Sequence, residues 1–576
     1  MTSSRLNIRR RQSLAHQLPD SLPALIQRLY ASRGVVSPEQ LNLSAANLLK
    51  PEFKGMAEAV KVLVQGLEAQ RSIVIVGDFD CDGATSSALM VHGLRAMGAR
   101  QVQYLVPNRF DYGYGLSPQV VEEVARMGGE LLITVDNGIS SVSGVAAANA
   151  KGMQVIVTDH HLPGNELPDA AAIVNPNQEG CAFPSKNLAG VGVAFYLLLA
   201  LRAALTEQGW FQRLGITAPN MGEYLDLVAL GTVADVVALD GNNRVLVHQG
   251  LQRMRAGRVR PGIQALIDIS QRNPSRLVAS DLGFALGPRL NAVGRLDDMS
   301  MGVACLLSEN LDEARKLAAM MDELNRERKA IEASMQHEAL ASLTKVNISQ
   351  GELPHGLVLH QDDWHQGVVG LVASRIKERY HRPVIAFAEA GEDELKGSGR
   401  SIPGVHLRDL LEEIDRQQPG VIDKFGGHAM AAGLSLRKSA LAPFKAAFER
   451  VAATWVSAEL LAGEIVTDGD LASEELILPL AEQVRAAGPW GQSFPEPLFD
   501  GEFRIIKQRL VGEKHLKLVV SIDEGRSLID AIAFNVDLSV WPNAAINKVQ
   551  LVYKLDINEW QGKQSLQLIV DNIAPL

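Results

Sequence analysis

The stretch SIVIVGDFDCDG, residues 72–83, joins a β-branched apolar run to a segment that carries three aspartates. Runs that are apolar on both sides fit strands buried on both faces of a parallel sheet. Similar runs follow at 102–106, 131–135 and 154–158, and segments of helical length that are rich in small residues separate them. Strands that alternate with helices in this way predict an α/β fold with a doubly wound parallel sheet.

The aspartates Asp78, Asp80 and Asp82 directly follow the first of these strands. In an extended chain, residues two apart point to the same side. The C-terminal ends of parallel strands open on the crevice where α/β proteins bind ligands. Carboxylates that converge there repel one another unless a cation neutralises them. We therefore expect a cation at this strand end; the alternative is a loop of solvated acids.

Acidic and imidazole side chains also follow two neighbouring strands. Asp136 comes after the run LLITV. Asp159, His160 and His161 come after the run QVIVT, and Asp235 interrupts an apolar helical run, where an unpaired acid is costly. A mixed set of carboxylate and imidazole ligands favours Mn²⁺ or Mg²⁺. Because this set is larger than one ion needs, we expect two ions that share a carboxylate and activate water for attack on a phosphoryl group.

The rest of the chain predicts three further parts. Residues 303–350 contain no glycine or proline and predict a long helix that bridges two domains. A smaller α/β unit follows, and five short strands after about residue 470 suit an OB-like β-barrel. The expected divisions are an N-terminal extension at 1–50, a catalytic domain with a helical extension at 51–300, a connecting helix at 301–350, the smaller α/β domain at 351–460 and the barrel at 465–576.

Composition narrows the class of protein. The chain has 576 residues, of which 47% are hydrophobic and 21% charged, so disordered and fibrous classes are excluded. The most apolar run is interrupted by Arg202 before it reaches the length of a membrane span, and the N-terminus lacks the apolar stretch of a secretory signal. Three scattered cysteines exclude a disulfide framework. We expect a monomer in a reducing cytoplasm, without a membrane partner.

The charge is uneven along the chain. A net charge of −10 argues against a surface coated for nucleic acid, yet segment 250–295 holds eight arginines, no lysine and two acids. Arginine without lysine favours bidentate phosphate contacts; the alternative is a solvated surface. These arginines are Arg253, Arg255, Arg258, Arg260, Arg272, Arg276, Arg289 and Arg295. No Walker motif is present, so an NTPase engine is not supported.

Four motifs, GDFDCDG, VDNG, VTDHH and GTVADVV, occur in an order and spacing that resemble those of the DHH phosphoesterase family. The segments GSGRS at 397–401 and KFGGHAMAAG at 424–433 resemble the GGH region of the family's DHHA1 domain. With PNRFDYGYG, GPRLNAVGR and DWHQGVVG, the likeness covers nearly the whole chain. It implies a DHH catalytic domain, a DHHA1 domain and a terminal OB-like domain, in the branch of bacterial single-strand-specific exonucleases.

The resemblance also implies roles for individual residues. The metal ligands would be Asp78, Asp80, Asp82, Asp136, His160 and Asp235, and the catalytic set would include His161 beside Asp80, Asp82, Asp136, His160 and Asp235. Contacts to phosphate or DNA would come from Arg109, Arg289, Asn291, Arg295, Ser398, Arg400, Gly426, Gly427 and His428. Glycine amides can approach a phosphate closely, and His428 can donate a hydrogen bond to it. For Asn291 and His365 a purely structural role is the alternative.

The implied activity is the release of 5′-mononucleotides from single-stranded DNA in the 5′→3′ direction, in DNA repair and recombination. The implied partners, besides single-stranded DNA, are a single-strand-binding protein and a RecQ-type helicase. Val76 stands where the family's manganese-dependent pyrophosphatases carry a histidine, which argues against that activity. Two alternatives stay open: a phosphodiesterase that acts on short oligonucleotides or cyclic dinucleotides, and a non-catalytic DHH scaffold. Relatives with small substrates are shorter, and scaffold relatives lose metal ligands that this chain keeps.

Overall fold

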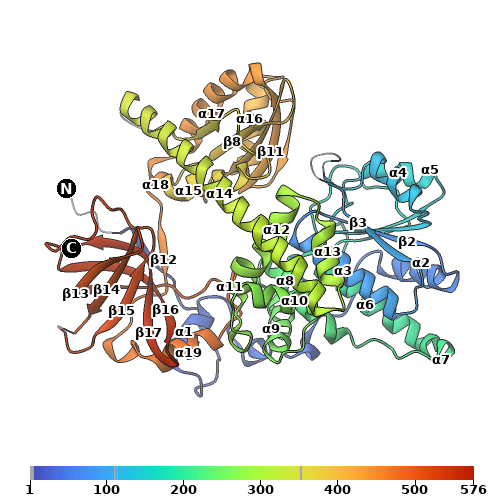
Figure 1. Cartoon of the computed structure of the whole chain (residues 1–576), viewed down its shortest axis with the longest axis horizontal. Helices are drawn as coiled ribbons and strands as arrows, with labels where there is room; N and C mark the ends of the chain where they lie inside the picture. Colours follow the sequence, from blue (N-terminus) through green and yellow to red (C-terminus); the bar gives the residue numbers. More distant parts are fainter. Residues whose placement is uncertain (1–5, 109–111, 113, 351–352, 524) are drawn as a thin grey trace. The chain divides into compact units, whose positions relative to one another are not determined.

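The computed structural model describes residues 6–108, 112, 114–350, 353–523 and 525–576, with side chains left out of the description at 346–350. The chain forms two compact units (Figure 1). Unit 1 comprises Met1–Asp322 together with Val466–Leu576, and unit 2 comprises Glu323–Ile465. Each unit is described on its own below.

The centre of unit 1 is a five-stranded sheet in which every pairing is parallel. Its spatial order is β3-β2-β4-β5-β6. The apolar runs decide this sheet, because β2 and β4 are buried at every position. The strands are β2 Ile73–Gly77, β3 Val102–Leu105, β4 Leu131–Val135, β5 Gln154–Thr158 and β6 Ala172–Val174.

Helices cover both faces of this sheet, which confirms the predicted doubly wound fold. On one face α4 and α5 form a core cluster with Val74 and Val76 of β2. On the other, α3 and α6 contact the strands and α8 packs against both helices. The helices of this unit up to residue 322 are α1 Ala24–Ala31, α2 Met56–Glu68, α3 Cys81–Ala96, α4 Pro118–Arg126, α5 Val142–Ala150, α6 Gly190–Glu207, α7 Trp210–Leu214, α8 Leu225–Ala234, α9 Gly241–Arg255, α10 Pro261–Ile269, α11 Ala279–Asp281, α12 Gly287–Leu296 and α13 Ser300–Leu307.

Helix α6 continues through Arg202, which interrupts the apolar run but not the helix, to Glu207. By length and composition it is the one helix among the described residues that could cross a membrane. However, 61% of it is buried inside the protein, and side chains such as Tyr196 and Leu197 are fully enclosed. A buried core helix passes the same test of length and composition.

The C-terminal strands close into a barrel of order β13-β14-β15-β17-β16, as predicted. The strands are β13 Phe499–Val511, β14 His515–Ser521, β15 Ile529–Ala533, β16 Lys548–Trp560 and β17 Lys563–Pro575. The N-terminal segment belongs to the same core, since Leu25, Ile26 and Leu29 of α1 pack with barrel residues and α19 Leu478–Ala486. Strand β1 Ile8–Arg10 pairs with β12 Ile465–Thr467, which precedes the barrel.

Unit 2 holds a mixed five-stranded sheet of order β10-β11-β9-β8-β7. Its strands are β7 Leu357–His360, β8 Val384–Glu389, β9 Glu394–Arg400, β10 Lys424–Gly427 and β11 Ala431–Arg437, and its helices are α15 Val369–Tyr380, α16 Leu407–Gln417, α17 Leu441–Trp455 and α18 Ala458–Ala462. The long helix α14, Leu311–Gln350, has 40 residues and contributes to both units, since the boundary falls after Asp322. This confirms the predicted bridging helix.

Candidate metal centre

The segment after β2 turns directly into a helix. Asp80 lies before the first turn of α3, where its Oδ1 accepts hydrogen bonds from the backbone amides of Asp82 at 2.9 Å and Gly83 at 3.0 Å. The expectation of one extended segment through Asp82 is therefore wrong. The physical reason is helix capping, because an aspartate before the first turn satisfies amides that have no partner within the helix.

The N-terminus of α6 holds the carboxylate of Asp82. The backbone amides of Gly190 and Val191 donate to its two oxygens at 2.6 and 2.8 Å. The side chain of Asp82 is fully buried. These two bonds lower the pKa of Asp82, but burial and then the charge of Asp80 outweigh them and raise it to about 7. Helix α6 thereby fixes the position of Asp82, a predicted ligand that is more than 100 residues away in the sequence.

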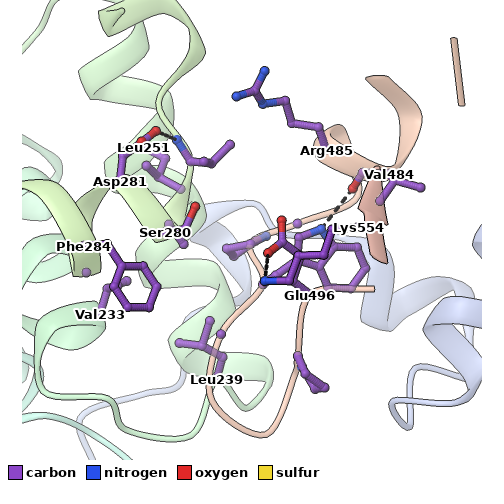
Figure 2. Close-up of a pocket in the computed structure, with 18 of the residues that line it drawn as sticks. Val233, Leu239, Leu251, Ser280, Asp281, Phe284, Val484, Arg485, Glu496 and Lys554 are labelled. Atoms are coloured by element: carbon purple, nitrogen blue, oxygen red, sulfur yellow. Dashed lines mark hydrogen bonds and ion pairs between the residues drawn. The ribbon is translucent and has the colours of Figure 1, made fainter. Parts of the chain in front are cut away.

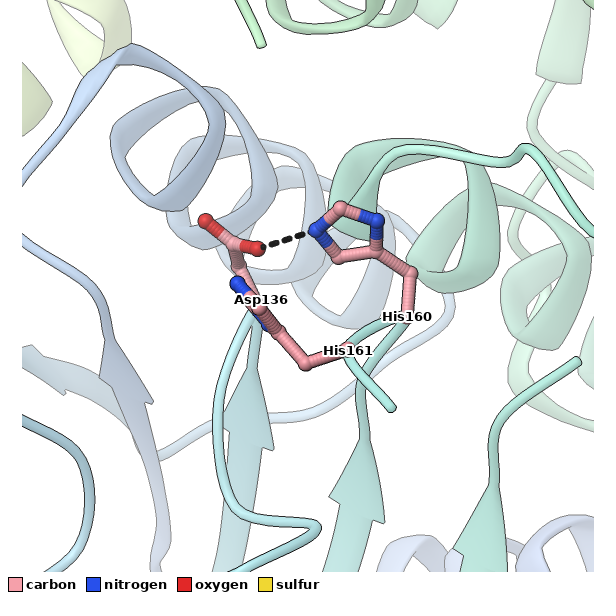
Figure 3. A group of neighbouring side chains, drawn as sticks. All are labelled: Asp136, His160 and His161. Atoms are coloured by element: carbon pink, nitrogen blue, oxygen red, sulfur yellow. Dashed lines mark ion pairs between the residues drawn. The ribbon is translucent and has the colours of Figure 1, made fainter. Parts of the chain in front are cut away.

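Asp136 and His160 extend from the ends of neighbouring strands and face each other (Figure 3). Asp136 has a φ of 61°, in the left-handed region that aspartate tolerates better than most residues. Its Oδ1 lies 3.1 Å from His160 Nε2. Asp235 follows the last residue of α8, rather than interrupting that helix, and its Oδ2 lies 3.5 Å from the same nitrogen. The imidazole therefore sits between carboxylates from two elements.

The structure gathers the six predicted metal ligands and His161 at one edge of the sheet. Ligand atoms lie within 4.8 Å of one another in three overlapping sets: Asp136 with His160 and His161, Asp82 with His160 and Asp235, and Asp78 with Asp80 and Asp136. Asp136 and His160 each belong to two of these sets, so the sets join into one continuous group. Such a group has room for more than one cation to share a ligand.

The chemistry of this group fits a divalent cation. Asp136 Oδ1 and His160 Nε2 are buried and, although close, have no hydrogen-bond partner. Burial lowers the pKa of His160 to about 4, which leaves a neutral imidazole that can act as a ligand. Burial, followed by the charge of neighbouring carboxylates, raises the pKa of Asp136 and of Asp235 well above its usual range. A cation would offset this repulsion and satisfy the two unpartnered atoms.

His161 is held in place by Asp159, for which the sequence predicts no role of its own. Asp159 is buried, and its carboxylate accepts from the amide of Ile139 at 2.9 Å and from His161 Nδ1 at 2.8 Å. Burial opposes protonation of His161, but the hydrogen bond and charge of Asp159 raise the pKa of His161 to about 9. The hydroxyl of Tyr114, in the motif PNRFDYGYG, lies 3.2 Å from the same nitrogen and was not predicted.

Helix α12 packs directly on the loop between β2 and α3. Asn291 Oδ1 accepts a hydrogen bond from the amide of Cys81 at 2.8 Å. A Cβ on Gly294 would lie only 1.7 Å from the carbonyl oxygen of Phe79, so only glycine allows this approach. The hydrogen bond gives Asn291 a structural contact, and its contact to phosphate stays a prediction. The sequence does not predict these contacts, because it does not reveal which helix packs on the loop.

The residues of unit 1 that are predicted to contact phosphate differ in their surroundings. Arg289 forms an ion pair of 2.8 Å with Asp322, and Arg295 lies in the last turn of α12. Arg109 lies outside the described residues. Within segment 250–295, Arg260, Arg272 and Arg276 also form ion pairs, with Asp226, Asp281 and Glu559 respectively. Much of this arginine-rich segment is therefore compensated inside the protein.

In unit 2 the remaining predicted residues meet at one end of the sheet. The strand register aligns Gly426 with Gly433 and Gly433 with Ser398, and His428 follows at the turn from β10 to β11. Arg400 Nη1 donates to Ser398 Oγ at 3.1 Å. Gly427 pairs with Ala432, next to this row, and His365 Nδ1 accepts from the amide of Gly367 in the turn before α15. Ser398, Arg400 and the glycine pair thus form one group.

The surroundings of Arg400 suit the binding of an anion. Burial lowers the pKa of Arg400, and among the described residues no carboxylate pairs with it. The first turn of α15 lies against it, because a Cβ on Gly370 would be 2.8 Å from Ser398 Oγ and 3.0 Å from Arg400 Nη2. A helix N-terminus beside an uncompensated guanidinium is a favourable place for a phosphate.

Comparison with known proteins agrees with this arrangement. The profile of the DHH family, N-terminal domain, matches residues 72–232, that of the DHHA1 domain matches 353–454, and that of the RecJ OB domain matches 467–572. The single-stranded-DNA-specific exonuclease RecJ of Dickeya dadantii is 59% identical over 570 residues, with 99% of each chain covered. The chain belongs to the RecJ family. RecJ of Escherichia coli is 56% identical, again with 99% of each chain covered.

Solved RecJ structures share the fold. RecJ of Thermus thermophilus in complex with Mn²⁺ has a TM-score of 0.77 and 30% identity, over 98% of this chain and 79% of that one. The Mg²⁺ complex of the same protein has a TM-score of 0.74 and 27% identity, over 99% and 79%. The fit of the carboxylate and imidazole group to divalent cations therefore agrees with the metals described in RecJ relatives.

Proposed function

We propose that this protein is a metal-dependent exonuclease that hydrolyses single-stranded DNA. The observation that carries the proposal is the buried, unpartnered pair Asp136 Oδ1 and His160 Nε2 at the centre of the ligand group. A scaffold without chemistry has no reason to keep two unsatisfied polar atoms beside crowded carboxylates, because both cost stability. The names of RecJ relatives supply the substrate class.

We assign metal binding to the six ligands described above, with two cations sharing Asp136. When bound, Mn²⁺ or Mg²⁺ would lower the pKa of a water and neutralise phosphoryl charge. Other residues position the metal ligands or contact the substrate. The α6 N-terminus holds the carboxylate of Asp82 in place, and Asp80 accepts a hydrogen bond from the backbone amide of Asp82. The imidazolium of His161, oriented by Asp159, stabilises the negative charge that develops on the phosphoryl oxygens.

We assign phosphate binding to Ser398, Arg400, Gly426, Gly427 and His428 in unit 2, supported by the uncompensated charge of Arg400. Arg109, Arg289 and Arg295 complete the proposed DNA contacts. For Arg289 the ion pair with Asp322 means that its guanidinium is already oriented before a phosphate arrives. For Asn291 we propose a structural role instead, because its Oδ1 holds the loop that carries the metal ligands.

The finer features follow from the resemblance alone. We propose 5′→3′ polarity, release of 5′-mononucleotides, and action in DNA repair and recombination as a cytoplasmic monomer. A single-strand-binding protein and a RecQ-type helicase are the proposed partners. The proposed domain divisions fall near residues 50, 300, 350 and 460–465.

A nucleotide-release assay tests the activity. We expect rapid release of labelled mononucleotides from single-stranded DNA with Mn²⁺, little release from blunt duplex DNA, and none with EDTA. Labels at either end of the strand decide the polarity. The conservative variant Asp136→Asn should abolish release, whereas the control Asp571→Asn, on an exposed barrel strand, should not. Metal binding without any release would support a scaffold, and preferential cleavage of cyclic dinucleotides or very short oligonucleotides would support the small-substrate alternative.

A further inference from the structure

Phe284 is an exposed aromatic side chain on a helical stretch that is otherwise covered. It is 84% exposed, whereas every other residue of 281–290 is buried or half-buried. A phenylalanine this exposed gives up the stability that burial of its ring would bring. None of the roles proposed above belongs to Phe284. Its ring is therefore a candidate for contact with a molecule from outside the chain.

The backbone connects Phe284 to a proposed DNA contact. Phe284 lies on Leu282–Leu286, a π-helical segment that continues directly into α12. Segments of this kind occur frequently at functional sites. Arg289, a proposed phosphate contact, follows within the same helical run, and its Nη1 donates to the carbonyl of Ala285 at 2.5 Å. An exposed ring and a guanidinium assigned to phosphate are thus held by one continuous helix.

The turn after α8 separates the metal centre from a cavity that Phe284 lines. Asp235 points toward the metal centre, where its Oδ2 lies 3.5 Å from His160 Nε2. The next residue, Val236, is 64% exposed and lines the cavity together with Phe284. Its φ of 60° is unfavourable for a β-branched residue, and backbone strain of this kind clusters at functional sites. The cavity, of about 640 Å³, is large enough to receive a ligand.

Two arginines of this cavity form no ion pair with any residue that the structure describes. They are Arg255 and Arg485, and both also line an adjoining cavity of about 300 Å³. The Nε of Arg255 donates to the carbonyl of Leu277 at 2.8 Å. Figure 2 shows that Arg485 extends from α19, whereas Phe284 comes from the helical wall. Cations without a carboxylate partner in a concave site favour an anion such as a phosphate.

The other charges of the lining nearly compensate one another. Lys554 pairs with Glu496 at 2.8 Å, and Arg272 pairs with Asp281 at 3.3 Å. With the carboxylate of Asp556, the whole lining carries one net positive charge. A duplex presents a dense row of phosphates and needs many cations. One positive unit fits a short length of a single strand better.

An exposed aromatic ring near unpaired arginines is the combination with which proteins bind single-stranded nucleic acid. Every base presents a flat face that stacks on an aromatic ring whatever the sequence, while cations meet the backbone. In a duplex the bases are already stacked on one another, and exposing a base costs energy. A ring in such a place therefore favours single strands over duplex DNA.

We propose that Phe284 is a stacking platform for one nucleobase of the single-stranded DNA substrate. The ring covers one face of the base, and Val236 packs against the edge of that base. A flanking phosphate lies toward Arg255 and Arg485. Because Val236 follows the proposed metal ligand Asp235, the stacked base holds the strand close to the metal centre. The proposal rests on the exonuclease function proposed above, and it assigns part of the preference for single strands to one side chain.

Binding of two single strands to the full chain tests the stacking. One is a fluorescein-labelled DNA strand of about 20 nucleotides, and the other has the same length and charge but consists of abasic residues. Anisotropy measures both affinities, with EDTA present to prevent cleavage. We expect Phe284→Ala to weaken binding of the base-bearing strand at least about fivefold and that of the abasic strand less than about twofold. Equal losses for the two strands, or no preference of the wild type for bases, would overturn the proposal.

Further variants separate stacking from simple apolar contact. Phe284→Tyr and Phe284→Trp keep a flat ring and should bind the base-bearing strand as the wild type does, whereas Phe284→Leu should lose as much as Phe284→Ala. A Phe284→Leu variant with wild-type affinity would also count against stacking. Leu214→Ala, exposed on α7, is the matched control and should leave both affinities unchanged. Blunt duplex DNA should bind equally well to the wild type and to Phe284→Ala.

Activity measurements keep this proposal separate from the proposed exonuclease function. Phe284→Ala should raise the KM for single-stranded DNA and leave kcat within about twofold, because the ring touches no reacting atom. A wild type that shows the expected dependence on bases but releases no nucleotides would contradict the exonuclease function and still support the stacking. Normal release together with equal losses for the two strands would contradict the stacking alone.

Discussion

The side-chain oxygen of Asn291 accepts a hydrogen bond of 2.8 Å from the backbone amide of Cys81. Cys81 is the first residue of α3 and lies between Asp80 and Asp82, two of the proposed metal ligands. A residue on α12 therefore fixes the backbone that sets the position of both carboxylates. Outer contacts of this kind tune metal affinity without touching the ion.

Replacing Asn291 by alanine should lower metal affinity. We expect Asn291→Ala to weaken Mn²⁺ binding about 10–100-fold, because the amide of Cys81 loses its acceptor and the loop is less ordered. Titration of Mn²⁺ followed by calorimetry measures this. Asn291→Asp, which retains an acceptor oxygen, should lose less. An unchanged Mn²⁺ affinity with a raised KM for DNA would instead return Asn291 to phosphate binding.

The close contact of α12 with the loop should not tolerate a larger residue. Gly294→Ala places a Cβ against the carbonyl oxygen of Phe79, and a backbone atom cannot move aside like a flexible side chain. We expect a destabilisation of roughly 1–3 kcal/mol, measured as the free energy of unfolding. Gly241→Ala, at the start of α9 with no neighbour within 4 Å, is the control and should be neutral or slightly stabilising. A fully stable Gly294→Ala variant would contradict this packing.

Removal of one carboxylate should separate activity from stability. Asp136→Asn keeps a residue that tolerates the left-handed backbone at this position, so the turn is preserved. We expect nucleotide release to fall at least about a thousandfold, while the Tm measured with EDTA stays equal or rises, because a buried and crowded charge is gone. Asp136→Ala should cost more stability. A lower Tm for Asp136→Asn would mean that this carboxylate stabilises the metal-free fold.

The group in unit 2 should act on the substrate and not on the metal. We expect Arg400→Ala to raise the KM for single-stranded DNA at least about tenfold, because the buried guanidinium is the uncompensated positive charge of that group. His428→Ala should also weaken DNA engagement. Calorimetric Mn²⁺ affinity should be unchanged in both variants. Loss of Mn²⁺ binding, or an unchanged KM, would argue against phosphate binding by these residues.

A histidine outside the metal centre should make stability depend on pH. Burial, followed by the charge of Arg260, lowers the pKa of His92 to about 4. Between about pH 6.5 and pH 4 the unfolded chain therefore takes up a proton at His92 that the native protein does not, and stability falls as the pH falls. Between pH 7 and pH 5 this amounts to about 2 kcal/mol.

Chemical denaturation at the two pH values measures this effect. His92→Gln cannot take up the proton, so its free energy of unfolding should fall less than that of the wild type between pH 7 and pH 5. Equal losses in the two proteins would show that His92 is accessible to protons in the native state.

Several parts of the fold are predictable from local pattern. The apolar runs that become β2 and β4 and the five barrel strands each carry their own periodicity or burial signal, so neighbouring residues suffice to place them. The absence of glycine and proline over 303–350 predicts one long helix, whereas the structure ends α13 at Leu307 and begins the 40-residue α14 at Leu311. The extended arrangement of Asp78 to Asp82 was wrong, because capping by Asp80 begins a helix that alternation of acids does not reveal.

The sequence alone determined which residue types follow the strands, and hence the carboxylate and imidazole chemistry at the sheet edge. Only the tertiary structure decided which distant groups hold those residues: Asn291 on the loop and the α6 amides on Asp82. The physical reason is that strand and helix signals depend on neighbours along the chain. Hydrogen bonds across 100 or more residues depend instead on how complete helices pack, and no short pattern encodes that.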